Sequence, residues 1–178
     1  LLGLFLSLQA LLAVCDFGLA TSLNRELASL PRDESRGTVA RDLVRAVEAL
    51  PWLGTVIFGV CAWALAPYIA EHWLLAKQRE ARELSSSVAL MGYAAAVQVP
   101  VLVYYGGIMG SQRIVLANLA NALLFSLRFL GAAGVALATS GNLVAFFGWH
   151  AVFGTVQAVA LRMVLLRSLP ESGHRSVF

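Results

Sequence analysis

Charge and catalytic motifs are both scarce in this sequence. Only 13% of the 178 residues are charged, whereas 59% are apolar, against roughly 45–50% apolar residues in soluble domains. The chain has no HExxH or GxSxG motif, and its three histidines lie far apart. Its two cysteines, Cys15 and Cys61, lie in apolar stretches and lack the spacing of metal ligands. We therefore expect no enzymatic activity, no disulfide, no metal site and no cofactor.

Long apolar runs take the place of the missing charge. Several blocks reach about 20 residues, the length that crosses about 30 Å of hydrocarbon as a helix. They are continuous rather than alternating, and strands of a membrane barrel need only about 10 residues. The sequence therefore predicts an all-α integral membrane protein, in which residues 1–166 form a polytopic bundle of transmembrane helices. The five predicted helices cover 1–23, 51–70, 87–109, 115–139 and 143–166.

The chain opens inside an apolar run. Its first residues, "LLGLFLSLQALL", include no methionine and no basic segment. A signal peptide would carry a basic segment before its apolar core. We therefore expect a fragment that begins within a transmembrane helix.

Basic residues divide unevenly between the two ends of the predicted bundle. One end carries three, Lys77, Arg79 and Arg82. The other end carries nine: Arg25, Arg32, Arg36, Arg41, Arg45, Arg113, Arg162, Arg167 and Arg175. The richer end is expected in the cytoplasm, which places the 24–50 loop and the tail 167–178 there. The net charge of +3 thus reflects topology, and no nucleic-acid motif is present.

The 24–50 loop contains a helical pattern. In "TVARDLVRAVEAL" (38–50) apolar residues recur at helical spacing. This pattern predicts either a short amphipathic helix on the inner membrane surface or a solvated extension of the next helix. Pro51 then either ends that segment or occupies the first turn of the next helix. Pro100 is expected to kink the third helix, because it removes one hydrogen bond.

Polar residues recur inside four of the five predicted helices. In each helix two of them are seven residues apart, which returns them to about the same helical face. The pairs are Gln9 and Asp16, Gln98 and Tyr105, Asn121 and Arg128 with Asn118 one turn earlier, and His150 and Gln157. Such stripes either hydrogen-bond neighbouring helices to one another or line a hydrated cavity.

Arg128 is the most informative of these residues. A charge in the middle of the membrane costs at least about 2.5–3.5 kcal/mol unless it is hydrated or paired. We therefore expect Arg128 to face the interior of the bundle. There it either offers positive charge to an anionic substrate or is satisfied by helix carbonyls or by Asp16.

Five segments together share their pattern with one known family. They are "DFGLATSLNRELA" (16–28), "LAPYIAEHWL" (65–74), "LMGYAAAVQVPVLVYYGGIMGSQRIVLAN" (90–118), "RFLGAAG" (128–134) and "FFGWHAVFGTVQAVALRMVLLRSLP" (146–170). The most specific motif runs from Asp16 and Gly18 to Arg25 and Glu26, and "GGIMGSQR" (106–113) comes next. The chain resembles bacterial Wzx-type polysaccharide and O-antigen flippases of the multidrug/oligosaccharidyl-lipid/polysaccharide exporter superfamily. His150 stands where the family is expected to have glutamine.

The resemblance implies both a fold and a task. The five helices would be helices two to six in the first bundle of a two-bundle transporter of the bacterial inner membrane. Such a transporter moves undecaprenyl-pyrophosphate-linked oligosaccharide repeat units to the outer leaflet by alternating access, for polysaccharide biosynthesis. Its partners would be this lipid-linked oligosaccharide, membrane lipids, and a polysaccharide polymerase with its assembly proteins. The candidate substrate- and cavity-lining residues are Asp16, Arg25, Gln98, Asn118, Asn121, Arg128, His150 and Gln157.

Two other functions stay open. The chain could be a membrane scaffold or assembly subunit of envelope biogenesis, in which the polar stripes only connect helices. It could also be a small-molecule antiporter of the same superfamily. A hydrated cavity would separate a transporter from a scaffold, and binding of lipid-linked sugar would separate a flippase from an antiporter.

The distribution of arginine gives a direct test of topology. We expect the Ser85→Cys variant to react with a membrane-impermeant thiol reagent added to intact cells, and the Ser35→Cys variant to be protected. Both variants are made in a background without the native cysteines. Labelling of Ser35→Cys but not of Ser85→Cys would show that the topology is the reverse of the predicted one.

Overall fold

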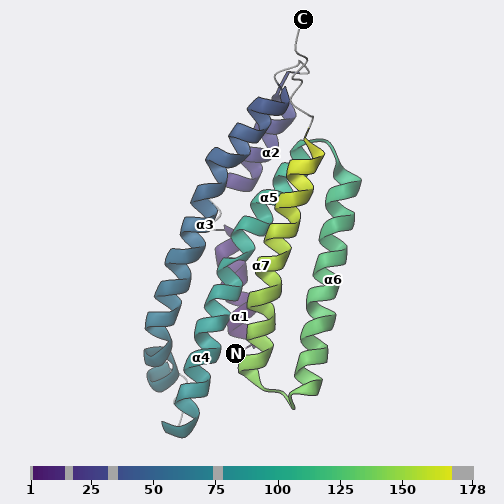
Figure 1. Cartoon of the computed structure of the whole chain (residues 1–178). Coiled ribbons are helices and arrows are strands. Elements are labelled where there is room, and N and C mark those ends of the chain that lie inside the picture. Colours follow the sequence, from purple (N-terminus) through teal and green to yellow (C-terminus); the bar gives the residue numbers. More distant parts are fainter. Residues whose placement is uncertain (1, 15–17, 32–35, 74–77, 170–178) are drawn as a thin grey trace, which may run out of the picture.

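The protein is helical throughout the part that the structure describes. The computed structural model describes residues 2–14, 18–31, 36–73 and 78–169, and no strand occurs among them. The elements, shown in Figure 1, are α1 (Leu2–Val14), α2 (Leu19–Ser29), α3 (Arg36–Tyr68), the π-helix η1 (Ile69–Trp73), α4 (Gln78–Ala96), α5 (Gln98–Gly110), α6 (Ile114–Ala138) and α7 (Leu143–Ser168). The all-α prediction is therefore confirmed.

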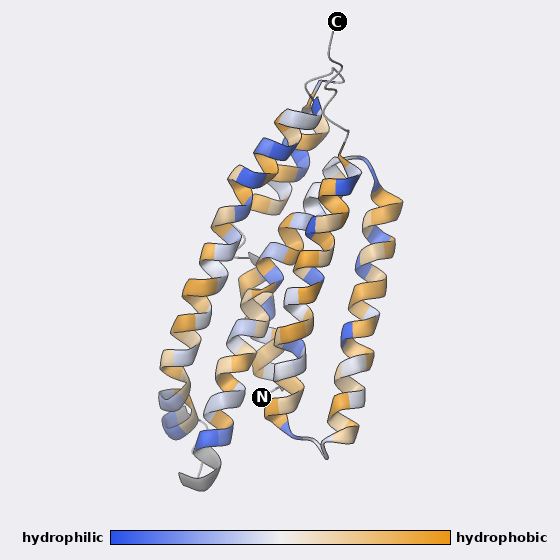
Figure 2. Ribbon diagram, in the orientation of Figure 1, coloured by the Kyte–Doolittle hydropathy of each residue, from blue (hydrophilic) through white to orange (hydrophobic). Residues whose placement is uncertain are grey.

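Four helical segments of the described chain are long and apolar enough to cross a membrane. They are Arg36–His72, Arg82–Gly110, Ile114–Ala138 and Leu143–Ser168. Figure 2 shows that apolar residues dominate these segments. The segments fit a multi-pass membrane protein, but the predicted count of five spanning helices is not confirmed.

The predicted first helix, 1–23, is interrupted. The described part of α1 holds 13 residues, about 20 Å of helix, and α2 follows it as a separate helix. Gly18 precedes α2 with a φ of 72°, a left-handed conformation that an α-helix cannot contain. The apolar composition of this stretch concealed the break, because it suits one helix as well as two. Cys15 and Asp16 lie outside the described residues.

The predicted 24–50 loop is also largely helical. Its first residues complete α2, and residues 36–50 are the beginning of α3. Of the two alternatives, the structure has the extension of the following helix. Pro51 lies inside α3 rather than at a helix end. Farther along α3, Cys61 is a free thiol on the exposed surface.

The third predicted helix breaks where a kink was expected. Val97 separates α4 from α5, three residues before Pro100. Because Pro100 has no N–H group, it cannot donate to the carbonyl oxygen of Ala96. The hydroxyl of Thr55 on α3 lies 3.3 Å from that oxygen and 2.7 Å from the carbonyl oxygen of Pro51. The Thr55 hydroxyl thus donates to the carbonyl oxygen of Ala96, to which Pro100 cannot donate.

The other helices pack around α5 and α7. α2 lies parallel to α5, and the carbonyl oxygens of Ala20 and Asn24 would be 2.6 and 2.5 Å from Cβ atoms added to Gly106 and Gly110. Glycines four residues apart therefore let two backbones approach closely, as in membrane helix pairs generally. α1 packs on α4 and α5, and α6 packs on α7 and α5.

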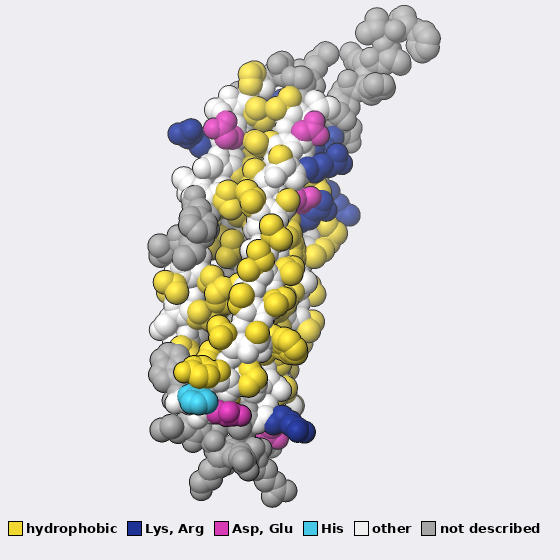
Figure 3. All heavy atoms as spheres, turned by 90° about the vertical axis from the view of Figure 1, so that its left-hand side faces the viewer, with side chains coloured by type: hydrophobic (Ala, Val, Ile, Leu, Met, Phe, Trp, Pro, Cys, Tyr) yellow, Lys and Arg dark blue, Asp and Glu magenta, His cyan; other side chains and the backbone are white. Residues whose placement is uncertain are grey.

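The ends of the bundle carry the charge. The start of α3, residues 111–113 and the end of α7 lie at one end, and η1, the start of α4 and the connection from α6 to α7 lie at the other (Figure 1). Figure 3 shows the same division on the α3 face, where an apolar band separates two charged ends. This surface is the one expected of a protein that lies across a bilayer.

Close packing of α2 on α5 gives a stability prediction. We expect Gly106→Ala to lower the stability of the purified protein by about 1–3 kcal/mol, because the new methyl group would overlap the backbone of α2. Gly134→Ala is the matched control, since nothing lies within 4 Å of a Cβ at Gly134. Thermal unfolding in detergent measures both, and equal melting temperatures for the two variants would contradict the close contact.

Candidate functional site

The predicted polar stripes of α6 and α7 meet in the bundle. Arg128 pairs with His150, and Asn121 pairs with Gln157. The two pairs have the same antiparallel register, because each step of seven residues forward on α6 matches a step of seven residues back on α7. The seven-residue spacing therefore correctly indicated which side chains share a face.

Arg128 faces the interior, as expected, and is 2% exposed. Its Nε donates a hydrogen bond to Nδ1 of His150 at 3.0 Å, and its Nη2 donates to the carbonyl oxygen of Ala94 at 3.4 Å. The side chain of Gln98 donates to the same carbonyl at 3.5 Å. Ala94 belongs to the last turn of α4, where carbonyls have no helical N–H partner. The break before α5 thus supplies an acceptor for the arginine.

His150 is the other partner of Arg128 and is 1% exposed. Its ring is surrounded by the rings of Phe5, Phe129 and Phe146, with centroids 5.3, 5.5 and 4.8 Å away. A nitrogen that accepts a hydrogen bond carries no proton, so the imidazole is neutral with its proton on Nε2. Two like unit charges about 4 Å apart repel by about 4 kcal/mol at an effective dielectric constant of about 20, which favours the neutral form beside Arg128.

Seven residues away on the same two helices, the next described polar pair consists of two amides. Nε2 of Gln157 donates to Oδ1 of Asn121 at 3.4 Å, and Gln157 is 1% exposed. Oε1 of Gln157 is buried without a hydrogen-bond partner in the described structure. Closer to the end of α5, the Tyr105 hydroxyl donates to Oδ1 of Asn118 at 2.7 Å. Asn118 is exposed, so the buried part of the α6 stripe comprises Arg128 and, partly buried, Asn121.

The three remaining candidates differ in their placement. Gln98 lies beside Arg128, since a Cβ on Gly154 would be 3.6 Å from both Nη2 of Arg128 and Nε2 of Gln98. Arg25 lies away from the interior, with 84% of its side chain exposed and a 3.5 Å ion pair to Glu26. Asp16 lies outside the described residues.

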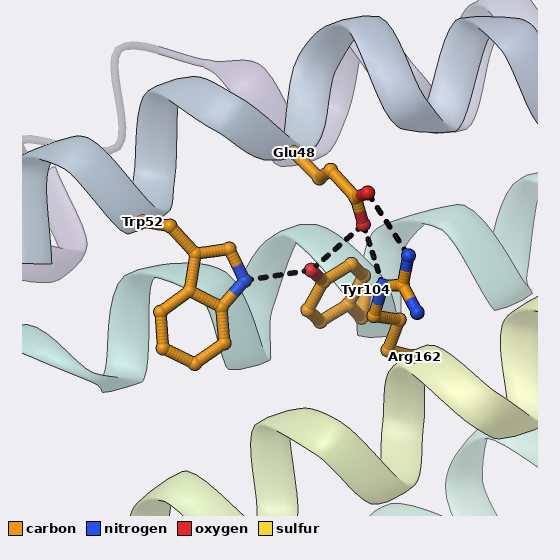
Figure 4. A network of polar contacts seen from close by, with 4 residues as sticks. All are labelled: Glu48, Trp52, Tyr104 and Arg162. Atoms are coloured by element: carbon orange, nitrogen blue, oxygen red, sulfur yellow. Dashed lines mark hydrogen bonds and ion pairs between the residues drawn. The ribbon is translucent and has the colours of Figure 1, made fainter.

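A second polar cluster was not predicted from the sequence. Arg162 on α7 donates from Nε and Nη2 to the two carboxylate oxygens of Glu48 on α3, at 2.6 and 3.0 Å. The hydroxyl of Tyr104 donates to Glu48 at 3.2 Å and accepts from the indole of Trp52 at 2.8 Å. Figure 4 shows this chain of contacts, which joins α3, α5 and α7.

The sequence offered only a weak signal for this cluster. Glu48 lay in the predicted cytoplasmic loop, and Arg162 was counted among the basic residues of the cytoplasmic end. The two residues are 114 positions apart, so no local periodicity connects them. Their meeting depends on α3 continuing through Pro51.

The described residues hold no group of three or more His, Cys, Asp or Glu side chains that could bind a metal ion. The polar contacts described above include those of two arginines, one buried and one partly exposed. One of these, Arg162, contacts a carboxylate, and the contacts of the other, Arg128, are with uncharged groups.

The carboxylate contact gives a prediction for Glu48. We expect Glu48→Gln to lower stability by about 1–3 kcal/mol, because it weakens two charge-assisted hydrogen bonds of a part-buried arginine. Glu26→Gln is the matched control, since Glu26 pairs only with the exposed Arg25 and exposed pairs contribute little. Thermal unfolding of both variants measures the effect. A Glu48→Gln protein as stable as Glu26→Gln would show that the Glu48–Arg162 contact contributes nothing to stability.

Comparison with known proteins adds no relative to this description. The likeness to polysaccharide flippases rests on the quoted segments, and the evidence for a function comes from the polar interior. No family model matches the chain, and neither does any curated protein or any solved structure.

Proposed function

We propose that the chain forms one bundle of a two-bundle transporter of the bacterial inner membrane. The transporter moves undecaprenyl-pyrophosphate-linked oligosaccharide from the inner to the outer leaflet by alternating access. The observation that carries this proposal is Arg128, a guanidinium in the core of the bundle whose described partners are both uncharged. Its positive charge is thus not matched by an acid among the described residues.

Arg162 provides an internal comparison for Arg128. Both guanidinium groups donate from the Nε–Nη2 edge. In Arg162 that edge meets the carboxylate of Glu48, which neutralises its charge. In Arg128 the same edge meets an imidazole and a backbone carbonyl, which orient the group, and no acid among the described residues pairs with it.

The edge of Arg128 between Nη1 and Nη2 suits a phosphate. The two described bonds employ two of the five N–H groups of the guanidinium. Paired N–H groups bind phosphate oxygens bidentately, and arginine is preferred for that reason. A pyrophosphate headgroup reaching the bundle core would supply the missing negative charge.

The broken helices support transport over a purely structural role. α1 and α2 pack beside α4 and α5, so that two interrupted helices lie against each other. Discontinuous helices of this kind form substrate sites near the middle of transporter membranes. Non-helical backbone at that depth is tolerated where protein or a wet cavity satisfies it.

The orientation and the partners belong to the same proposal. The arginine-rich end of the bundle would lie in the cytoplasm, where the lipid-linked substrate is made. The polymerase and assembly proteins that consume the substrate would act on the outer side. The second bundle would complete the cavity beside the exposed flank of α6.

Substitution of Arg128 tests the proposal in cells whose polymer export depends on the full-length protein. We expect Arg128→Lys to retain partial export. Arg128→Gln should lower export about ten- to hundredfold, because the loss of charge-assisted bonds costs about 1.5–3 kcal/mol. Protein level and melting temperature should stay unchanged. Arg167→Gln, which removes an exposed arginine of α7, is the matched control and should export normally.

Other outcomes would contradict the role of Arg128. Undiminished export by a stable Arg128→Gln protein excludes substrate binding by this residue. Parallel loss of export, protein level and melting temperature would identify Arg128 as structural, as a scaffold requires. Binding of a small cationic drug, with no binding of undecaprenyl pyrophosphate by the purified protein, would favour the antiporter.

A further inference from the structure

We infer that His150 is a permanently uncharged positioning residue that holds the guanidinium of Arg128 by its Nε edge. The inference rests on the proposed role of Arg128 and adds a second residue to it. Nothing in the sequence distinguishes this use of a histidine from a protonated or metal-bound one. The hydrogen bond from Nε of Arg128 to Nδ1 of His150, 3.0 Å long, makes the distinction.

The geometry fixes the tautomer of His150. An arginine Nε always carries a proton and can only donate. Nδ1 must therefore present its lone pair, and the ring proton sits on Nε2. Protonation of Nδ1 would place an N–H group against an N–H group and break the bond.

The surroundings of the ring oppose a second charge. Phe5 from α1, Phe129 from α6 and Phe146 from α7 surround it, and α1 contains no ionisable side chain between Leu2 and Val14. Among the described residues, Arg128 is the charged group that bonds to the ring. No described acid contacts the ring to stabilise an imidazolium.

Ionisable groups on the other helices that pack on α7 are engaged elsewhere. On α4 the Tyr93 hydroxyl bonds to Thr155, and Glu83 lines a cavity beside Asn142 at the far end. On α5 the hydroxyls of Tyr104 and Tyr105 bond to Glu48 and Asn118. His150 consequently acts as a fixed acceptor across the working pH range.

The consequence for Arg128 is orientation. His150 and the Ala94 carbonyl hold the Nε–Nη2 edge from α7 and α4. A planar group held at two points on one edge cannot rotate, so its opposite edge has a fixed direction. A ligand oxyanion then meets donors that are already ordered, which lowers the entropic cost of binding.

Nitrogen-15 NMR of the histidine side chains tests the inference on the chain itself. The protein is labelled at its three histidines, placed in lipid nanodiscs and titrated from about pH 5 to pH 9. His150 should keep the pattern of the Nε2–H tautomer throughout. The His150→Gln variant assigns the signal, because its spectrum lacks it. A His150 signal that titrates in this range, or that shows a proton on Nδ1, overturns the inference.

A matched pair of arginine variants isolates the hydrogen bond. Arg128→Met keeps an unbranched side chain but carries no N–H donor, so the Nδ1 resonance of His150 should move downfield. Arg162→Met leaves that resonance unchanged, because Arg162 contacts Glu48 instead. An Nδ1 resonance that is the same in wild type and in Arg128→Met would show that the bond is absent. Where Arg128→Met does not fold, Arg128→Leu, which also carries no N–H donor, is read instead, and an unchanged resonance again counts against the bond.

The outcome is separable from that of the proposed function, because the NMR experiment uses no substrate. A neutral, hydrogen-bonded His150 together with normal export by Arg128→Gln would keep the positioning contact and remove the transport role. A titrating His150 together with lost export by Arg128→Gln would remove the positioning contact and keep the transport role. His150→Leu, which has no hydrogen-bond acceptor, should lose export. His150→Gln, whose amide oxygen can accept from Arg128, should retain it.

Discussion

A backbone carbonyl inside a membrane has no water to bond, and this requirement organises the interior of the bundle. The interruption between α4 and α5 leaves carbonyls without helical donors, and each described partner comes from a side chain. Thr55 on α3 reaches Ala96, while Arg128 on α6 and Gln98 reach Ala94. The break that Pro100 causes is therefore also the point at which α3, α6 and α7 are connected through polar contacts.

The buried Arg128 and the partly exposed Arg162 show how one type of side chain serves two purposes in the same bundle. Arg162 meets a carboxylate, and their contact joins α3 to α7. Arg128 meets neutral acceptors, and its burial therefore carries a larger desolvation cost with less compensation. Among the described residues no acid offsets that cost, and this difference from Arg162 is the basis of the role proposed for Arg128.

Sequence periodicity predicted which side chains share a helical face better than it predicted where the helices begin and end. A seven-residue spacing placed Asn121, Arg128, His150 and Gln157 on facing stripes, because helical geometry alone decides which residues share a face. The break near Pro100 was predictable for the same local reason. The break before Gly18 was not, since an apolar stretch suits one helix or two, and the Glu48 contact depends on tertiary packing that no local pattern contains.

The length of α3 has a mechanical consequence. Arg36–His72 holds 37 residues, about 55 Å of helix, whereas the hydrocarbon core is about 30 Å thick. The excess either tilts the helix or carries its first turns beyond the membrane surface. Because Glu48 ties this part of α3 to α7, the protruding turns act as a lever. The tilt of α3 or the position of its first turns is therefore linked through this contact to α7, the helix that carries His150.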